Sequence, residues 1–199
     1  MRLIDVYAKL KLIPIPVFRT QDASAYLKIS APHASKLLSR LRDAKLLIHL
    51  NRDNWALPDI DRLILPSFLT APFPSYLSLQ TALYYHGMIS QIPDTIYTIS
   101  IARTKLFKTP IANVSVHHIH PDFFFGFEEK NNGLIKIATP EKALIDIFYL
   151  TQAKSGLFRS LPEVEIPKTF NFSLAKKIIE RIPSENRKKT VKERFKKFC

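Results

Sequence analysis

The sequence contains little cysteine, little glycine and no long apolar run, and each absence narrows what the chain can be. Cys199 is the only cysteine among 199 residues, so no internal disulfide framework can form, which is typical of a reducing compartment. The four glycines form no phosphate-binding loop, and no nucleotide fingerprint is present. No apolar run has the length of a membrane span, and the first twenty residues do not resemble a signal peptide. We therefore expect a cytoplasmic protein that does not enter a membrane.

Positive charge is in excess and is unevenly distributed along the chain. The formal net charge is +13 and the pI is about 9.9. Residues 1–65 contain 11 Lys and Arg against 6 Asp and Glu, residues 66–150 contain 6 of each kind, and residues 151–199 contain 13 against 5. Such an excess favours a polyanionic partner, and its distribution predicts that the two ends of the chain bind it.

Apolar periodicity predicts an α+β protein, in which an N-terminal winged helix-turn-helix is followed by a mixed domain with an antiparallel sheet covered by helices. We assign residues 1–65 to the winged helix-turn-helix, residues 66–183 to the mixed domain, and residues 184–199 to a basic C-terminal tail. The length of the chain allows one large or two small domains, which agrees with this division.

The N-terminal region has the pattern of three helices and a two-stranded wing. The expected helices cover residues 2–12, residues 21–28 with Thr20 as cap, and a third segment with Ser30 as cap; the strands cover residues 46–50 and 55–57. Residues 51–54 have the composition of a turn, so Arg52 is expected at the tip of the wing.

The third helix is expected to present an apolar stripe on one face and basic or hydroxyl side chains on the other. No acidic residue precedes Asp43 in it, so Lys36 and Arg40 can reach phosphates or guanine in a major groove. The predicted DNA contacts are Ser30, His33, Ser35, Lys36, Ser39, Arg40, Arg42 and Arg52. The same pattern is compatible with a small helical domain whose charged face is simply solvated.

The mixed domain begins with prolines among apolar residues. Residues 66–77 predict an ordered connector, and Ser78 is expected to cap a helix that ends at His86, with Gly87 at the C′ position. β-branched and aromatic residues then predict an antiparallel sheet of four or five strands. The expected strands cover residues 95–101, 105–108, 113–120, 123–128 and 134–138.

A helix is expected to follow this sheet and to cover it. Thr139 is its predicted cap, Pro140 its first residue, and Glu141 an acidic residue suited to the positive end of the helix. Asp146 interrupts the apolar stripe and is expected to be a partly buried group bonded to a neighbouring loop.

The last part of the chain is basic and less regular. We expect residues 151–170 to be irregular and Ser173 to cap a helix over residues 174–181. Residues 187–199 predict either a frayed terminus or a phosphate-contacting helix with Val191, Phe195 and Phe198 on one strip.

Two clusters contain residue types found in metal or catalytic sites. His117, His118 and His120 lie close together, but no cysteine pair or acidic trio completes a metal site. Another set, Asp122 followed by Glu128, Glu129 and Lys130, has the residue types of a metal-dependent nuclease at very short spacing. We predict no metal, no cofactor and no catalytic residue, and keep a nuclease and a protein-interaction module as alternatives.

Two segments resemble the AbiEi family of antitoxins, which belong to type IV toxin–antitoxin and phage abortive-infection systems. The segments are SLQTALYYHG at residues 78–87, followed by Ile92-Pro93, and ATPEKALID at residues 138–146. The resemblance covers roughly residues 10–150 and includes the order of a winged helix-turn-helix and a following antitoxin domain. The residues that it marks in the antitoxin domain are His86, Gly87, Thr139, Pro140, Glu141, Lys142 and Asp146.

The resemblance implies a transcriptional repressor of its own operon that also counteracts a co-encoded nucleotidyltransferase toxin. Its partners would be double-stranded operator DNA and, directly or indirectly, that toxin. Spacing alone indicates only that residues 139–150 form a well-capped amphipathic helix.

Overall fold

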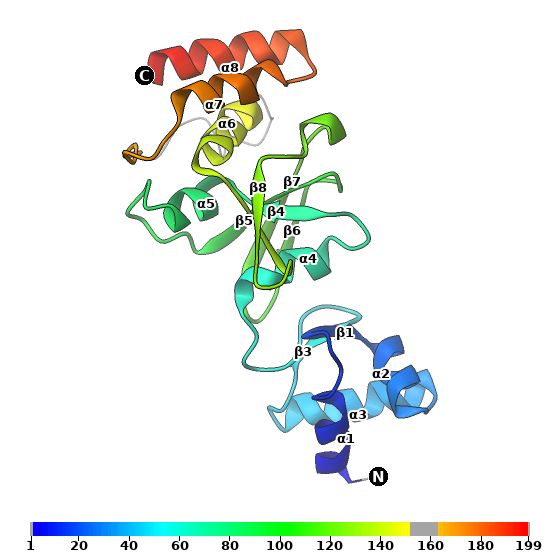
Figure 1. The fold of residues 1–199 in the computed structure, drawn as a ribbon. Helices are drawn as coiled ribbons and strands as arrows, with labels where there is room; N and C mark the ends of the chain where they lie inside the picture. The colour runs from blue at the N-terminus through cyan, green and yellow to red at the C-terminus, as the bar shows by residue number, and fades with distance from the viewer. Residues whose placement is uncertain (1, 152–162, 199) are drawn as a thin grey trace. The chain divides into compact units, whose positions relative to one another are not determined.

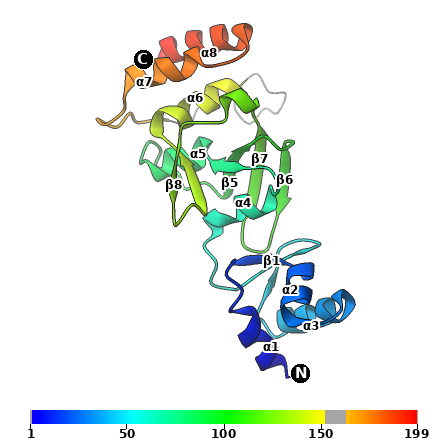
Figure 2. The ribbon, with the colours of Figure 1, turned by 45° about the vertical axis from the view of Figure 1, so that its right-hand side comes forward.

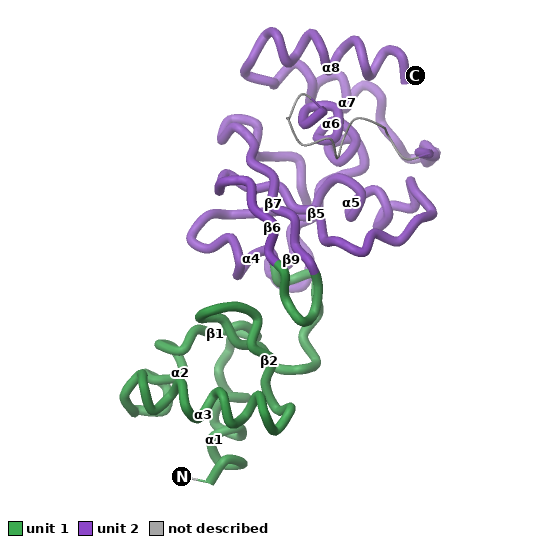
Figure 3. Tube along the Cα trace, turned by 180° about the vertical axis from the view of Figure 1, so that it is seen from behind, with its two compact units in different colours: residues 1–65, 108–112 green, residues 66–107, 113–199 purple. Residues whose placement is uncertain are grey.

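The computed structural model describes residues 2–151 and 163–198, and the chain forms two compact units. Unit 1 comprises residues 1–65 and 108–112, and unit 2 comprises residues 66–107 and 113–199 (Figure 3, green and purple). The described residues form eight α-helices and two sheets, one of three antiparallel strands and one of six mixed strands. The predicted α+β class is therefore confirmed. No helix in the described ranges is long and apolar enough to cross a membrane.

Three helices form the core of unit 1 (Figure 1). They are α1 (Leu3–Leu10), α2 (Thr20–Leu27) and α3 (Ala31–Asp43). The buried face of α3 is the apolar stripe that the sequence predicts, formed by Ala34, Leu37, Leu38 and Leu41. These side chains pack with residues of α1 and α2, including Val6, Leu10, Ala23 and Leu27. Burial of such stripes supplies most of the stability of short helices.

The small sheet of unit 1 has one strand more than expected. Strands β2 (Ile48–His49) and β3 (Asn54–Ala56) form the predicted hairpin, and β1 (Val17–Arg19) adds to the other edge of β3. The sequence did not predict β1, because Pro14 and Pro16, which directly precede it, indicated only the end of the first helix. In the pairing, Phe18 lies opposite Trp55, and both side chains are buried in the core.

The start of α2 differs from the prediction. Thr20 is the first residue of the helix and not its cap, because its hydroxyl oxygen accepts a hydrogen bond from Trp55 Nε1 at 3.0 Å. Arg19 holds the N-cap position, and its backbone N–H donates to Asp22 Oδ2 at 2.7 Å. Ser30 is at the N-cap of α3 as predicted, although its side chain makes no capping hydrogen bond.

The larger sheet belongs to unit 2 and is mixed, so the prediction of an antiparallel sheet was wrong. Its strands are β4 (Ser75–Leu77), β5 (Thr95–Ser100), β6 (Lys105–Lys108), β7 (Asn113–His118), β8 (Phe127–Lys130) and β9 (Ile135–Ala138), in the order β6-β7-β5-β4-β9-β8. The pairs β4–β9 and β5–β7 are parallel, whereas β4–β5 and β8–β9 are antiparallel. The β4–β9 pair arises because β4, a buried strand inside the expected connector, inserts between β5 and β9, and the β5–β7 pair arises because β7, and not β6, lies next to β5.

The expected strand over residues 123–128 is also wrong. Pro121–Phe123 form a 3₁₀ turn, in which the His120 side chain accepts from the backbone N–H of Asp122, and the chain then loops to Gly126. Gly126 has φ +80°, a conformation that L side chains rarely adopt, and β8 begins only after it. The aromatic run that was expected to be a strand therefore folds as a turn, in which Phe123 is buried and Phe124 and Phe125 are half-buried.

The helices of unit 2 cover its sheet. A 3₁₀ turn (Arg62–Ile64) precedes α4 (Leu65–Leu69), and α5 (Leu79–Tyr85), α6 (Pro140–Leu150), α7 (Phe172–Glu180) and α8 (Glu185–Phe198) follow. In Figures 1 and 2, α6 lies between the sheet and the pair formed by α7 and α8, and all of its residues after Pro140 are buried. The α5 helix ends as predicted, with Gly87 at φ +67°.

Most of the residues expected as a basic tail, residues 184–199, belong to helix α8, which packs within unit 2. Val191 and Phe195 are buried, and Phe148 of α6 contacts the rings of Phe195 and Phe198 at centroid distances of 6.5 and 5.9 Å. The predicted apolar strip is therefore confirmed.

The preceding helix begins earlier than expected. Asn171, and not Ser173, caps α7, since Asn171 Oδ1 accepts from the N–H of Leu174 at 2.9 Å. Part of the expected irregular stretch, residues 152–162, and the Cys199 thiol lie outside the described residues.

Candidate nucleic-acid interface and buried ion pair

The outer face of α3 displays the side chains that the sequence predicts as DNA contacts. His33, Ser35, Lys36 and Arg40 are exposed, as is Ser30 before the helix, and Ser39 is half-buried. The apolar stripe fixes this orientation, since burial of Leu37 and Leu38 turns the opposite side of the helix outward. The helix has no acidic residue in its first turn and reaches one only at its last residue, Asp43. The face is therefore cationic and rich in hydrogen-bond donors.

Arg42 differs from the other predicted contacts because it already has a partner. Its Nη2 and Nε atoms bond to Asp43 Oδ1 at 2.8 and 3.0 Å. Both side chains are substantially exposed, and an exposed pair of this kind contributes at most about 1 kcal/mol. Arg42 can thus exchange Asp43 for a phosphate, but it is a weaker candidate than Lys36 or Arg40.

Arg52 is exposed on an ordered turn between β2 and β3. Asn51 Oδ1 accepts hydrogen bonds from the backbone N–H groups of Asp53 and Asn54 at 3.3 and 3.1 Å, which holds the turn. At the base of the turn, the Trp55 ring stacks on His49 with centroids 4.1 Å apart. The turn therefore presents Arg52 to solvent from a fixed support.

Unit 2 contains a fully buried ion pair. Lys142 Nζ and Asp146 Oδ1 are 2.6 Å apart on successive turns of α6, and neither side chain is exposed. The second carboxylate oxygen of Asp146 accepts from Tyr76 Oη at 3.0 Å and from Ser78 Oγ at 2.8 Å. Lys142 Nζ also donates to the carbonyl oxygen of Phe123 at 3.1 Å. The expected partly buried Asp146 is therefore completely buried, and its partners come from α6 itself and from the segment around β4.

Aromatic rings and a glycine lie against the Lys142 side chain. Its Nζ lies 3.6 Å from the ring centroid of Phe123 and 5.1 Å from that of Phe125, distances at which a cation is attracted to the ring face. A Cβ atom on Gly126 would lie 3.0 to 3.2 Å from Lys142 Cγ, Cβ and Cδ. Gly126 is therefore required both by its positive φ and by its close approach to the lysine.

Burial and pairing act in opposite directions on these titrating groups. Burial lowers the pKa of Lys142, and the charge of Asp146 opposes this change. Burial raises the pKa of Asp146, and Lys142, Ser78 and Tyr76 oppose it. Burial and the neighbouring Asp146 raise the pKa of Tyr76 well above its ordinary value, so its hydroxyl remains a donor. The hydrogen bonds and the short ion pair support the charged form of both partners.

The other residues marked by the family resemblance also make internal contacts. Thr139 Oγ1 accepts from the N–H of Lys142 at 3.3 Å, which is the predicted cap. Glu141 Oε1 accepts from the backbone N–H of Asn171 at 2.8 Å and so links α6 to the start of α7. His86 Nε2 donates to the carbonyl oxygen of Ala138 at 2.7 Å, which links the end of α5 to β9. The motif thus joins segments of unit 2 and presents no ligand-accessible surface at Lys142 or Asp146.

The sequence identified only part of this cluster. Lys142 and Asp146 belong to the recognisable motif, whereas Tyr76 lies in the segment that was expected to be a connector, and Ser78 was expected only as a cap. Gly126 was not singled out, although a glycine that follows three aromatic residues is a signal of close backbone approach.

The histidines and the nuclease-like carboxylates do not form one site. His117 is buried and bonds to Ser115, His118 bonds to backbone carbonyl oxygens, and His120 is exposed beside Asp122. Glu128 pairs with Lys130, and Glu129 pairs with Lys136. In residues 2–151 and 163–198, no three or more His, Cys, Asp or Glu side chains are arranged to hold a metal ion.

No protein-family model matches this chain, and a comparison with curated proteins gave no match. The similarity to AbiEi antitoxins therefore depends on the two motifs described above.

The buried ion pair predicts a large cost for removing one partner. Lys142→Met should lower the free energy of unfolding by about 3–5 kcal/mol, because Asp146 would remain fully buried without its cation. Lys136→Met is the control, since Lys136 pairs with Glu129 at the surface and lies 5.5 Å from the ring centroid of Phe127, and the loss of its ion pair should cost no more than about 1 kcal/mol. Urea unfolding followed by circular dichroism measures both, and equal losses would contradict the structural role of the pair.

His117 predicts a loss of stability in acid. Burial lowers the pKa of His117 from 6.5 to about 4, so the unfolded chain binds a proton in this range that the folded chain does not. The free energy of unfolding should therefore fall by about 3 kcal/mol as the pH drops from about 6.5 to about 4. Urea unfolding at several pH values should show that His117→Gln removes this component and that His118→Gln, at an exposed neighbour, retains it. An unchanged pH dependence in His117→Gln would refute the assignment.

Proposed function

We propose that the chain is a DNA-binding transcriptional repressor whose unit 1 is a winged helix-turn-helix and whose unit 2 has an antitoxin function. The face of α3 is the observation that carries the first part. Five exposed polar or basic residues, Ser30, His33, Ser35, Lys36 and Arg40, lie on or beside one side of a helix whose other side is buried. A helix of this kind fits the major groove, where basic side chains meet phosphates or guanine.

The turn that carries Arg52 supports the same proposal. In a winged helix-turn-helix, α2 and α3 form the helical pair, and the β2–β3 hairpin is the wing beside it. Arg52 would then contact a phosphate or an adjacent minor groove, while Lys36 and Arg40 contact the major groove. The bonds of Asn51 keep the hairpin turn in a single conformation, which lowers the entropic cost of such a contact.

DNA affinity should depend on the outer face of α3. We expect Lys36→Ala combined with Arg40→Ala to weaken binding to the DNA upstream of the chain's own reading frame by about tenfold or more. Both side chains are exposed, so the fold should persist. Gel-shift titration at one fixed salt concentration measures the change, because salt alone alters such affinities strongly.

The matched control is Lys9→Ala combined with Lys11→Ala. These lysines are exposed in α1 and just after it, so the control removes the same charge from unit 1 without altering α3. Equal weakening by the two double variants would show that DNA binding depends only on the net charge of unit 1, and would contradict a recognition helix. An unchanged affinity of the α3 variant would contradict DNA binding by this face.

The antitoxin part of the proposal is supported by the resemblance at residues 78–87 and 138–146. These segments contain the residues that join α5, β9, α6 and α7, so the motif would maintain the shape of unit 2 rather than perform chemistry. The partner would be a nucleotidyltransferase toxin encoded beside this chain, and we propose no enzymatic activity for the chain itself.

A variant that no longer binds DNA through α3 should still protect cells from that toxin. When the neighbouring reading frame is expressed from an unrelated promoter, the wild-type chain and the variant with Lys36→Ala and Arg40→Ala should both restore growth, because both retain unit 2. Lys142→Met should fail, since its unit 2 is destabilised. Colony counts measure the effect, and loss of protection in the α3 variant would show that unit 2 is not sufficient.

A further inference from the structure

A cavity of about 480 Å³ lies between α7 and α8 at the C-terminal end of unit 2. Its apolar lining comes from Phe172 and Ile179 of α7 and from Phe195 of α8. Its polar lining consists of Lys176, Glu180, Lys192 and Lys196. A volume of several hundred cubic ångströms with an apolar floor and a few polar groups is characteristic of sites for small ligands or parts of larger ones.

Phe172 is the unusual part of this lining. Its ring is 43% exposed, whereas Phe195, the other aromatic residue of the cavity, is 4% exposed. The ring centroids of Phe172 and Phe195 are 6.4 Å apart. Phe170 and Phe172 form an edge-to-face contact, with ring centroids 5.0 Å apart. Phe172 is thus supported by other rings and still offers an uncovered aromatic surface to a ligand.

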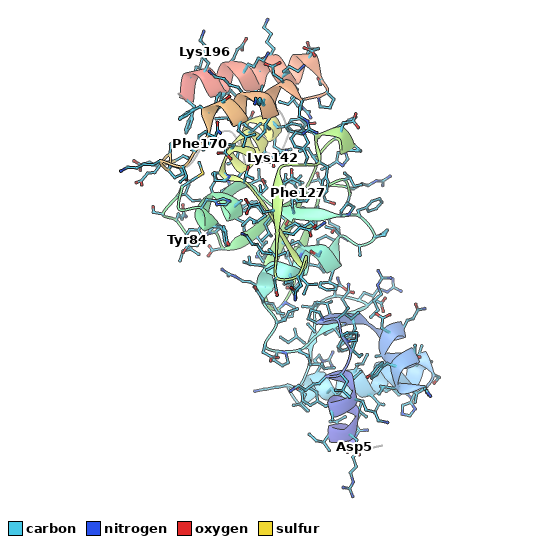
Figure 4. All side chains as sticks on the ribbon, in the orientation of Figure 1. Asp5, Tyr84, Phe127, Lys142, Phe170 and Lys196 are labelled. Carbon is cyan, nitrogen blue, oxygen red and sulfur yellow. The ribbon has the colours of Figure 1, made fainter. Side chains whose placement is uncertain are left out.

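The lysines make the cavity cationic. Lys192 Nζ is paired with Glu180 Oε1 at 2.7 Å, so these two charges largely cancel. Within the described parts of the chain, Lys176 and Lys196 form no ion pair. Figure 4 shows Lys196 on the outer side of α8. A ligand of the cavity would therefore meet one aromatic surface and two uncompensated positive charges.

The charge continues beyond the cavity along both helices. Lys177 of α7 and Lys189, Arg194 and Lys197 of α8 are exposed as well. A small carboxylate would use only the two cavity lysines, whereas a polyanion can use the entire basic surface. The surrounding charge therefore favours a nucleic acid over a small acid or a short acidic peptide.

We propose that this cavity binds an unpaired nucleotide of a single-stranded nucleic acid, with the base on Phe172 and the flanking phosphates at Lys176 and Lys196. Aromatic platforms combined with a basic surface are the usual means of binding single strands. In a duplex the faces of the bases are stacked on one another and cannot reach a recessed phenylalanine. The site is therefore separate from the operator contacts proposed for α3, and does not depend on them.

Fluorescence anisotropy of the full chain with labelled oligo(dT) and oligo(rU) of about 12 nucleotides tests this proposal. Both arms are needed because ribose and deoxyribose strands share the recognised base and phosphate chemistry. We expect Phe172→Ala to weaken binding of the preferred strand by about tenfold. Leu174→Ala is the control, since Leu174 is a similarly exposed apolar residue of α7 outside the cavity, and it should change the affinity less than twofold, a change of roughly 0.4 kcal/mol.

A second comparison does not depend on the packing of Phe172. Lys176→Gln with Lys196→Gln should weaken binding more than Lys177→Gln with Lys197→Gln, although both double variants lose the same charge from the same two helices. Equal effects of the two lysine pairs, or of the two apolar substitutions, would overturn the proposal.

Competition completes the test and identifies the alternatives. Unlabelled single strand should displace the probe more effectively than duplex of equal length or a glutamate-rich peptide containing phenylalanine. Displacement by the duplex at equal efficiency would show simple phosphate attraction, and stronger displacement by the peptide would show a protein-binding groove. Either result would refute the single-strand site, and neither would affect the α3 proposal, which depends on operator DNA.

Discussion

The ion pair between Lys142 and Asp146 is the constraint on which the arrangement of unit 2 depends. A charge without access to water requires a partner and a full set of hydrogen bonds, and here β4, the turn at Phe123 and α6 together supply them. A shift of any of these segments would leave a buried charge incompletely bonded. The pair therefore favours one arrangement of these segments, which the apolar core alone would hold less specifically. The Lys142 side chain also leaves little space for a Cβ atom at position 126, where glycine is found.

Unit 1 is held together by apolar packing together with one polar bond at its centre. Trp55 stacks on His49, faces Phe18 across the β1–β3 pair and donates to Thr20, so a single side chain connects all three strands with the start of α2. The buried face of α3 stabilises the fold, so the residues on its outer face can be basic without a loss of core packing. This division between a buried and a displayed face is what relates the stability of unit 1 to its proposed role.

Local patterns predicted the parts of the fold that local physics determines. The stripe of α3, the Thr139 cap and the Gly87 terminus each follow from spacing or from one backbone requirement, and all three are present. Strand β4 and the turn at residues 121–123 could not be predicted in this way. The first is a three-residue strand that follows two prolines and pairs with both of its neighbours, and the second is held by the buried lysine. Tyr76 and Ser78, which donate to Asp146 from 70 and 68 residues away, likewise could not be predicted from a local pattern.

The burial of α6 from Glu141 to Leu150 has a consequence for synthesis of the protein. The chain emerges from the ribosome N-terminus first, so α6 is made well before α7 and α8, which cover it. Until Phe195 and Phe198 have been added, the ring of Phe148 lacks its partners and the apolar side of α6 remains open to chaperones or to premature association. Residues 1–65 contain nearly all of unit 1, and its apolar core lies entirely within them. Unit 1, for which we propose DNA binding, can therefore fold while the last helix of unit 2 has not yet been synthesised.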